Sequence, residues 1–309
     1  MTRNLRPGRD IAVAVTGIAL SGLLIYTTVW SYQYLFIDWG RDANMFHIFD
    51  VGLVDIGKYA AATPDGTRLY YTPAGERSVN HLPVTWQVRD RDLRTFDGQH
   101  GLILAPSAPH GAEYLVTTFQ GDNQSLPALR EFYPTGRVSH TVSNNYGVPH
   151  SSVFSVDANT SPTLKMQNTL SAQLEDGIDL LGSSLSSAVI RPGETLTVTL
   201  FWQATEGPTR RRHTVFTHLL GPAKADGSIV WAQHDGPPLD NSYPTTRWAQ
   251  GEIIVDRHKF TVPNDAPPGV YPIEAGLYTP ERGGARLRRL GAARQPVGDN
   301  VIVGTVTVR

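Results

Sequence analysis

The sequence predicts an α+β multi-domain protein with a single N-terminal transmembrane helix, a small α/β domain and a C-terminal immunoglobulin-like antiparallel β-sandwich. Three observations lead to this prediction: an uncharged apolar run near the N-terminus, a middle region that alternates between helical and strand patterns, and a C-terminal half dominated by period-two alternation and turn residues. The expected ranges are residues 1–37 for the cytoplasmic N-terminus and anchor, 38–160 for the α/β domain, and 165–309 for the sandwich, which we expect to fold alone.

The composition is that of a folded, turn-rich protein. Hydrophobic residues make up 40% of the 309 residues and charged residues 18%, and the formal net charge is −1. With so small a net charge there is no global field to attract nucleic acid, and no nucleic-acid partner is expected. The sequence has no cysteine, which excludes disulfides, thiolate metal sites and cysteine nucleophiles.

The predicted anchor is the uncharged run at residues 11–30, which is long enough to cross about 30 Å of hydrocarbon as a helix. Arg3, Arg6 and Arg9 precede it, so the positive-inside rule places the N-terminus in the cytoplasm and the bulk of the chain outside the cytoplasm. Aromatic residues cluster at the other end as an interfacial belt: Tyr26, Trp30, Tyr32, Tyr34, Phe36 and Trp39. A cleaved signal peptide is the alternative, but its apolar core is shorter and is followed by small residues. An uncleaved anchor in the cell membrane is therefore expected.

The anchor also offers a contact point for a second helix. Gly17 and Ser21 form a small-xxx-small pair, which lets a neighbouring helix approach closely. A polytopic membrane protein is thus a candidate partner, and a plain anchor without helix contacts is the alternative.

The middle region alternates between helices and strands. Apolar residues recur at spacings of three and four in a predicted helix: Met45, Ile48, Phe49, Leu53, Ile56 and Tyr59. Further helices are expected at residues 79–88 and 126–133, and strands at 68–72, 93–96, 101–105, 113–119, 137–142 and 152–156. This order favours an α/β sheet with some parallel pairing. Neither a Gly-x-Gly-x-x-Gly loop nor a Gly-x-Ser-x-Gly elbow is present, so a nucleotide site and the commonest hydrolase site are unsupported.

The C-terminal half reads as a series of strands. Residues 195–202 (TLTVTLFW) alternate cleanly between polar and apolar side chains, as in a strand with one buried face. The turn sequences RPGE at 191–194 and PPG at 267–269 introduce strands. The expected strands are residues 169–174, 195–203, 213–220, 229–234, 253–262, 270–278 and 301–308. Strands of this number and spacing favour an immunoglobulin-like sandwich.

Several of these segments also resemble a known family. The matching residues are 191–202 (RPGETLTVTLFW), 216–220 (FTHLL), 232–238 (AQHDGPP), 242–248 (SYPTTRW), 267–271 (PPGVY) and 276–278 (GLY). They resemble the C-terminal module of bacterial polytopic glycosyltransferases of the protein O-mannosyltransferase and aminoarabinose transferase superfamily, which use polyprenyl-phosphate-linked sugars. Asp38-Trp39 and residues 81–83 (HLP) carry a weaker similarity to the extracytoplasmic domain that precedes this module.

The resemblance implies a role without a catalytic centre in this chain. In that family, transfer is run by acidic residues of a many-helix membrane domain, which this sequence does not contain. No catalytic residue is therefore carried over. The resemblance implies a membrane-anchored, extracytoplasmic accessory or binding protein linked to cell-envelope glycan transfer. A tail subunit or fragment of such a glycosyltransferase, and a structural envelope protein, remain as alternatives.

The most unusual segment is the proline-rich loop at residues 235–248, which we predict to be the ligand site if there is one. Its candidate contacts for a glycan or glycoprotein are Asp235, Asp240, Asn241, Tyr243, Arg247 and Trp248. Aromatic faces and planar polar groups together are typical of sugar sites. The alternative is that Trp248 packs under the sandwich and the prolines stiffen a long crossover between strands.

Two other clusters have the chemistry of a possible site. His213, His218, His234 and His258 lie in predicted strands, and His218 and His234 with Asp235 have the chemistry of zinc ligands. They lack the short spacing of a metal motif, so no metal and no cofactor are expected. Residues 210–212 (RRR) form a hairpin tip that either contacts anionic lipid or wall polymer or is simply solvated.

Overall fold

The computed structural model describes residues 7–73, 82–119 and 121–309. Its contacts divide the chain into two compact units. The first consists of Met1–Gly52 with Ser143–Val148, and the second, the main unit, of Leu53–Val142 with Pro149–Arg309.

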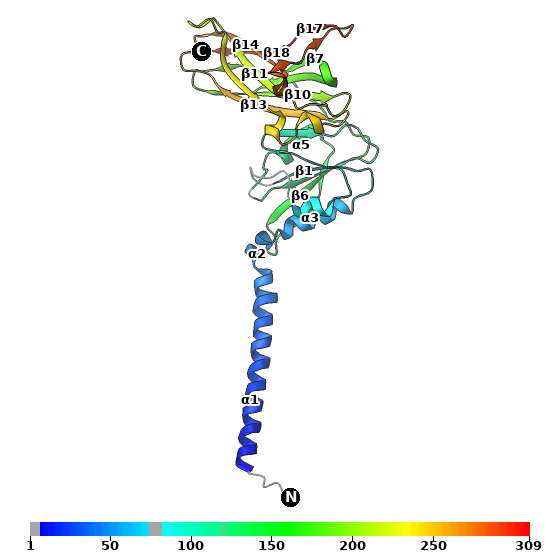
Figure 1. Cartoon of the computed structure of the whole chain (residues 1–309), viewed down its shortest axis with the longest axis vertical. Coiled ribbons are helices and arrows are strands. Elements are labelled where there is room, and N and C mark those ends of the chain that lie inside the picture. The colour runs from blue at the N-terminus through cyan, green and yellow to red at the C-terminus, as the bar shows by residue number, and fades with distance from the viewer. Residues whose placement is uncertain (1–6, 74–81, 120) are drawn as a thin grey trace. The chain divides into compact units, whose positions relative to one another are not determined.

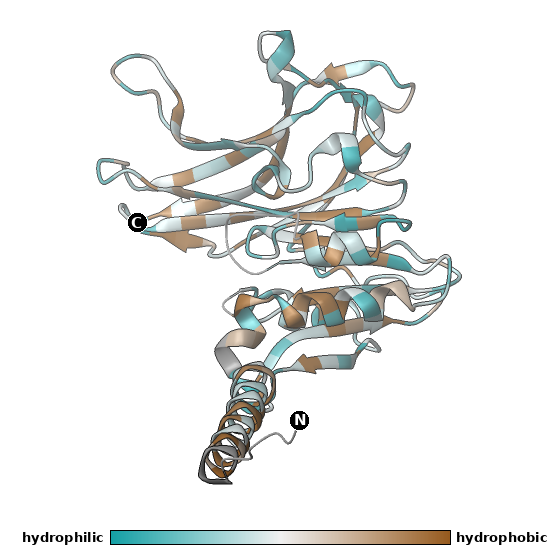
Figure 2. Ribbon diagram, turned by 60° about the horizontal axis from the view of Figure 1, so that its bottom comes forward, coloured by the Kyte–Doolittle hydropathy of each residue, from teal (hydrophilic) through white to brown (hydrophobic). Residues whose placement is uncertain are grey.

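The first unit contains the predicted anchor. Helix α1 (Pro7–Tyr32) continues through a π-helical turn (Gln33–Asp38) and a 3₁₀ turn (Trp39–Arg41), and α2 (Ala43–Ile48) follows. Figure 2 shows that apolar residues dominate α1, and side chains such as Ile18 and Leu24 are 74% and 66% exposed. The 26 residues of α1 span about 39 Å at 1.5 Å each, which confirms one helix long and apolar enough to cross a membrane. Its orientation and compartment stay predictions, and Arg3 and Arg6 lie outside the described residues.

The main unit begins with a mixed sheet, sheet A. Its strand order is β2-β1-β4-β6-β5: β2 Leu93–Thr95, β1 Arg68–Thr72, β4 Ala112–Thr117, β6 Pro149–Val156 and β5 Arg137–Ser143. Strand β1 pairs with both β2 and β4 in parallel, whereas β4 and β6 are antiparallel. Sheet A confirms that the middle region combines helices with partly parallel strands.

Three helices accompany sheet A: α3 Val51–Ala61, α4 Leu82–Gln87 and α5 Ser125–Phe132. Helices α3 and α4 meet at Gly57, where an added Cβ would lie 3.0 Å from Gln87. Helix α5 lies between sheet A and the C-terminal strands (Figure 1), and its Phe132 meets Phe201 edge-to-face at 6.2 Å between ring centroids. The predicted helix at residues 79–88 overlaps α4, and its first three residues lie outside the described residues.

The C-terminal half forms two further sheets. Sheet B has the order β17-β16-β7-β8-β10-β13-β3: β17 Pro296–Gly298, β16 Arg289–Leu290, β7 Asn168–Leu174, β8 Ile178–Leu185, β10 Thr195–Ala204, β13 Ile253–Thr261 and β3 Gly101–Leu104. Sheet C has the order β12-β11-β14-β18-β9, with β15 on β14: β12 Val230–Gly236, β11 Thr214–Leu220, β14 Gly269–Thr279, β18 Val301–Val308, β9 Val189–Ile190 and β15 Ala285–Arg286. The α+β class with one apolar helix is confirmed, and the immunoglobulin-like topology stays a prediction.

One hydrophobic core runs through the main unit. Strand β3, which lies in the range expected for the α/β domain, pairs antiparallel with β13 as the edge strand of sheet B. A single cluster of buried side chains includes Tyr70 and Tyr114 of sheet A together with Trp202 and Trp248 of the C-terminal half. Residues 165–309 are therefore covered on one side by earlier parts of the chain, although the predicted domain ranges stay a prediction.

Candidate ligand-binding pocket

The predicted loop at residues 235–248 divides into two parts with different surroundings. Two short 3₁₀ turns shape it, Pro238–Asn241 and Thr245–Arg247. In the second part, Tyr243 and Trp248 are fully buried, and Trp248 Nε1 donates to the Tyr243 carbonyl oxygen at 3.0 Å. Neither ring face is open to a sugar, so the expected aromatic contribution to a glycan site is corrected. The alternative, in which Trp248 packs in the core, describes what the structure shows.

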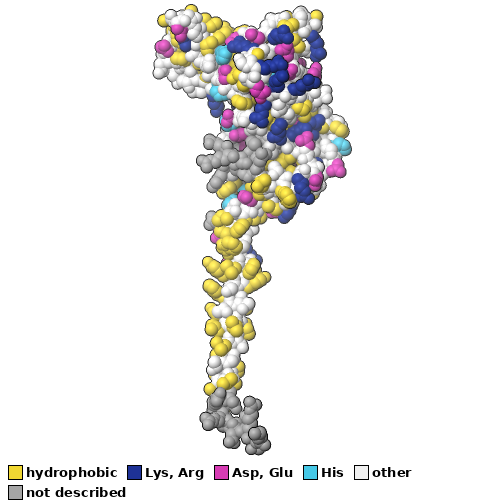
Figure 3. Space-filling view, in the orientation of Figure 1, with side chains coloured by type: hydrophobic (Ala, Val, Ile, Leu, Met, Phe, Trp, Pro, Cys, Tyr) yellow, Lys and Arg dark blue, Asp and Glu magenta, His cyan; other side chains and the backbone are white. Residues whose placement is uncertain are grey.

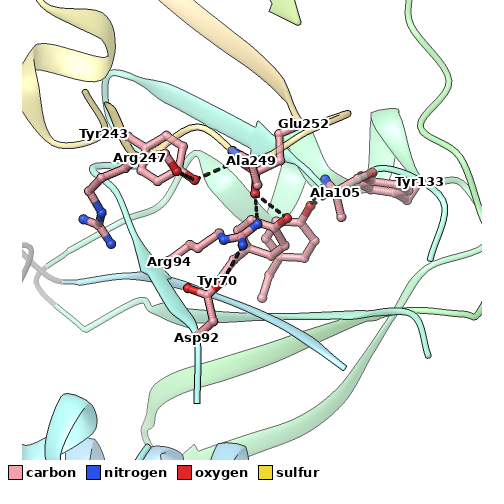
Figure 4. Close-up of polar contacts among 10 residues, drawn as sticks. Tyr70, Asp92, Arg94, Ala105, Tyr133, Tyr243, Arg247, Ala249 and Glu252 are labelled. Carbon is pink, nitrogen blue, oxygen red and sulfur yellow. Dashed lines mark hydrogen bonds and ion pairs between the residues drawn. The ribbon is translucent and has the colours of Figure 1, made fainter. Parts of the chain in front are cut away.

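The second part of the loop leads into a buried polar cluster around Glu252, the Glu252 network (Figure 4). The Glu252 carboxylate is fully buried and accepts hydrogen bonds from the Tyr70 hydroxyl at 2.9 Å, the Tyr243 hydroxyl at 2.7 Å and the Ala249 amide at 2.8 Å. Arg94 Nη1 forms an ion pair with the same carboxylate. Every oxygen is thus satisfied, as burial of a charge requires.

The electrostatics of the Glu252 network indicate a structural role. Burial, reinforced by the negative charge of Glu252, raises the pKa of Tyr70 and of Tyr243 well above the ordinary tyrosine value, so both remain neutral donors. Burial opposes the charge on Arg94, but Glu252 outweighs it and the pKa of Arg94 is raised. The network ties β1 and β2 of sheet A to the segment before β13, and it leaves no polar atom of Glu252 free for a ligand.

Arg247 and Asn241 of the predicted site are both exposed. The Arg247 guanidinium lies over the Tyr243 ring at 5.4 Å from its centroid, and its Nη1 donates to Thr95 Oγ1 at 3.4 Å. Arg247 therefore covers the Glu252 network rather than joining the two aspartates of the loop.

The first part of the loop lines a cavity of about 340 Å³. We call it the histidine pocket after its three lining histidines. The titratable lining residues are His100, His234, His258, Asp235, Asp240, Asp256, Arg257 and Lys259. It lies where β12, β13 and the turn after β2 meet, and residues far apart in sequence contribute to it. Of the six predicted site residues, Asp235 and Asp240 are brought together here, and Asn241 adjoins them.

A chain of hydrogen bonds runs through the pocket wall. His258 Nε2 lies 2.7 Å from Asp256 Oδ2, and His258 Nδ1 lies 2.8 Å from His234 Nδ1. Asp256 and His258 are buried, whereas His234 is exposed. If His258 Nε2 donates to the carboxylate, its neutral Nδ1 accepts from His234, which leaves His234 Nε2 as an acceptor. Partial desolvation of the His234 ring at the pocket wall, aided by the neighbouring His258, lowers the pKa of His234, which keeps that imidazole neutral at pH 7.

The opposite side of the pocket comes from the turn that precedes β3. His100 Nδ1 lies 3.0 Å from Asp97 Oδ2, and its Nε2 lies 3.8 Å from Asp240 Oδ2. On the neighbouring wall, Arg257 Nη1 donates to Gln124 Oε1 at 3.0 Å. Hydrogen bonds and ion pairs therefore fix the pocket's side chains on both sides of the paired strands β3 and β13.

The backbone at the pocket edge is strained. Leu239, Asp240 and Asn241 have φ angles of 50°, 51° and 65°, in the left-handed region that a leucine rarely adopts. Two interactions hold Leu239 there: its side chain is fully buried, and its amide donates to Asp256 Oδ1 at 3.0 Å. Strain of this kind concentrates at binding and catalytic sites, and here it sets the position of the exposed Asp240 carboxylate.

Within the described parts of the chain, no group of three or more His, Asp or Glu is arranged to hold a metal ion. An Asp–His–His chain can orient a general base, but neither imidazole bonds to a hydroxyl nucleophile among the described residues. His218, which has the chemistry of a zinc ligand, contacts Glu274 at 2.9 Å and Asp235 at 3.4 Å.

Sequence reasoning did not identify His100, Asp256 or the pairing of His258 with His234. Asp256 and His258 are two residues apart on a strand and therefore lie on the same face, so their proximity could have been predicted from the sequence. The contact of β12 with β13, and the entry of His100 from the earlier region, depend on tertiary structure.

Comparison with protein-family models gave no match, and comparison with curated proteins gave none. Solved structures similar to part of the chain include the Pseudomonas fluorescens alkylpurine DNA glycosylase AlkC bound to DNA containing an abasic site analog, with 14% identity over 43% of this chain and 30% of that chain and a TM-score of 0.28. Another is the CARDB domain of a Pyrococcus furiosus protein in complex with di-metal ions, with 11% identity over 47% of this chain and 95% of that chain and a TM-score of 0.22. TM-scores this low carry no information about function.

Proposed function

We propose that this chain is a membrane-anchored, extracytoplasmic binding protein that serves cell-envelope glycan transfer as an accessory, without a catalytic centre of its own. The observation that carries the binding role is the histidine pocket. Its volume of about 340 Å³ lies in the range of small-molecule sites, and a few polar groups converge on it. The family resemblance of residues 191–202 and 242–248 supports the link to glycan transfer, and helix α1 supports the anchor.

The free polar groups of the pocket suit the hydroxyls of a sugar. Lys259 and the Gln99 side-chain amide form no hydrogen bond among the described residues, and Asp240 approaches only His100. A sugar hydroxyl can donate to Asp240 while it accepts from Lys259 or from the Gln99 amide. Since Tyr243 and Trp248 are buried, polar contacts alone would hold the ligand. We expect a dissociation constant of about 1 mM, near −4 kcal/mol.

An immunoglobulin-like sandwich would provide the scaffold for this site. His234 on β12 and His258 on β13 come from different sheets, and each strand is paired along its length with a neighbour. Side chains on rigid strands are placed more precisely than side chains on loops, which lowers the entropic cost of ordering them when a ligand binds.

The binding role is tested by calorimetric titration. The full-length chain in non-ionic detergent is titrated with neutral oligosaccharides of the kinds found in cell envelopes. The Asp240→Ala and His100→Ala variants each remove one side of the pocket opening. Each should weaken binding at least tenfold, because a hydrogen bond to a charged group contributes about 1.5–3 kcal/mol. Asp265→Ala is the matched control, since Asp265 is exposed and does not line the pocket.

Equal affinities for Asp240→Ala, His100→Ala and the control would place the binding elsewhere on the chain. If the wild-type chain binds none of the oligosaccharides, the binding role is contradicted and the structural envelope protein is favoured.

A further inference from the structure

A second cavity, larger than the histidine pocket, is surrounded by arginines. It has a volume of about 610 Å³ and lies beside the loop between β10 and β11 and the turns that follow β7 and β14. We call it the arginine pocket after five of its lining residues: Arg210, Arg211, Arg282, Arg286 and Arg294. Figure 3 shows Lys and Arg side chains gathered at the upper right of the main unit, in the region where Figure 1 labels β17.

The charges around this cavity do not balance. The same lining contains the acidic residues Glu175, Asp176 and Glu206, so five positive charges face three negative ones, an excess of two. An excess of positive charge in a concave surface raises the local concentration of anions. An anion is therefore the ligand that this cavity favours.

Three of the five arginines form no ion pair with another described residue. Arg294 pairs with Glu206 at 3.5 Å, and Arg286 reaches Glu274 at 3.6 Å. Arg210, Arg211 and Arg282 form no ion pair among the described residues and are exposed. Their guanidinium groups retain all their donors for a ligand.

The loop that carries Arg210 and Arg211 is held in place by buried polar groups. The Arg211 carbonyl oxygen accepts from Thr209 Oγ1 at 2.6 Å and from Thr245 Oγ1 at 3.1 Å. The buried His213 follows the arginines and contacts two lining residues of the pocket, Asp176 at 3.0 Å and Thr279 at 3.1 Å. The arginine side chains thus extend from a fixed backbone, unlike those of a solvated hairpin tip.

We propose that the arginine pocket binds a phosphate group carried on a larger polar molecule. Each planar guanidinium can donate paired hydrogen bonds to two oxygens of a phosphate, and several converging arginines favour a phosphate group over a single carboxylate. The cavity is large enough to hold more than an inorganic phosphate. This site is separate from the histidine pocket and does not depend on the function proposed for it.

The test uses the full-length chain in non-ionic detergent and calorimetric titration with a hexose phosphate, the unphosphorylated hexose, inorganic phosphate and glycerophosphoglycerol. The hexose phosphate represents a soluble monoester, and glycerophosphoglycerol represents a phospholipid head group without its acyl chains. We expect the hexose phosphate to bind at least tenfold more tightly than the hexose, with an affinity that falls as salt is added. Tighter binding of glycerophosphoglycerol would also support the site and identify a lipid head group as the source.

The variant Arg211→Gln/Arg282→Gln should weaken phosphate binding at least tenfold. Arg212→Gln is the matched control, because Arg212 is an exposed neighbour that does not line the pocket, and it should bind as the wild type does. Equal melting temperatures would show that all variants are folded. If the double variant does not fold, the single variant Arg282→Gln replaces it in the binding test. Absence of phosphate binding, or equal loss in Arg212→Gln and the double variant, would overturn the proposal.

Discussion

Among single residues, Glu252 illustrates how a buried charge determines stability rather than chemistry. Its carboxylate accepts from two tyrosines, a backbone amide and Arg94, and it is fully buried. Replacing one member of a buried ion pair leaves the other without compensation, which costs far more than the pair itself contributes.

We therefore predict that Glu252→Ala lowers the free energy of unfolding by about 3–5 kcal/mol. The Arg94 side chain is 16% exposed, so water can reach it and the loss should fall at the lower end of this range. The measurement is the thermal midpoint of the detergent-solubilised chain, with Glu281→Ala as an exposed control. Equal midpoints for the two variants would mean that the network contributes little to stability.

The histidines predict how stability changes with pH. Burial lowers the pKa of His234, and burial also lowers that of His213 despite the opposing charge of Asp176. As the pH falls through about 6.5, the unfolded chain takes up protons that the folded chain resists, so stability decreases. We expect the melting temperature to fall between about pH 7 and pH 5.

The double variant His213→Gln/His234→Gln should show a smaller fall in melting temperature across that pH range. His110→Gln, at an exposed histidine that lines neither pocket, is the matched control. A pH dependence that is the same in all three proteins would assign it to other groups.

At the scale of single elements, most strands could be predicted because their side chains alternate. Residues 195–203 and 301–308 correspond to β10 (Thr195–Ala204) and β18 (Val301–Val308) almost residue for residue. Strand β8 was missed, since the Gly-Ser-Ser of Ile178–Leu185 reads as a turn. The structure explains the glycine: the β8–β10 register shifts beside it, and Gly182 packs closely against residues 166 and 168.

This close packing predicts that Gly182→Ala is destabilising by about 1–3 kcal/mol. A Cβ there would lie 2.5 Å from the Asn168 carbonyl oxygen and 2.5 Å from Met166 Sδ, and the backbone atom cannot move away cheaply. Gly269→Ala at the start of β14 is the control, because its Cβ would meet Tyr271 at an ordinary 3.6 Å. Thermal melting of both variants provides the comparison, and an unchanged midpoint for Gly182→Ala would show that β8 shifts to accept the methyl group.

The loop at residues 235–248 shows what sequence cannot provide at this scale. Its polar and aromatic residues suggested one surface, yet Asp235 and Asp240 line the histidine pocket while Tyr243 and Trp248 enter the core. Whether a loop aromatic faces solvent or the core depends on what the loop crosses. Here the crossing covers the junction between sheets A and B, which no local pattern encodes.

On the scale of the whole molecule, the position of β3 changes the expectation for the C-terminal fragment. Its short apolar run was recognised as a strand, but its partner β13 is separated from it by about half the chain. Expressed alone, residues 165–309 would lose the β3 pairing along β13, and Tyr243 and Glu252 would lose Arg94 and Tyr70. We now predict that this fragment melts well below residues 53–309, or aggregates through the exposed edge of β13. Equal melting temperatures would restore the original expectation that the fragment folds alone.

The membrane orientation can be tested by labelling single introduced cysteines, because the natural sequence has none. Since the chain contains no cysteine, a single introduced thiol is the only site for a maleimide that cannot cross membranes. Arg3, Arg6 and Arg9 precede the uncharged run at residues 11–30, whereas the first charged residues after it, within residues 38–42, are two aspartates and one arginine. The difference in positive charge favours a cytoplasmic N-terminus.

On intact cells with a permeable outer layer, Lys165→Cys should therefore react with the maleimide, and Thr2→Cys should react only after the cells are opened. The unmodified chain is the blank. The reverse pattern would place both pockets in the cytoplasm, away from any acceptor at the cell surface. It would contradict the role in envelope glycan transfer and leave phosphate binding by the arginine pocket unaffected, because that site depends on the local placement of charges and not on the side of the membrane.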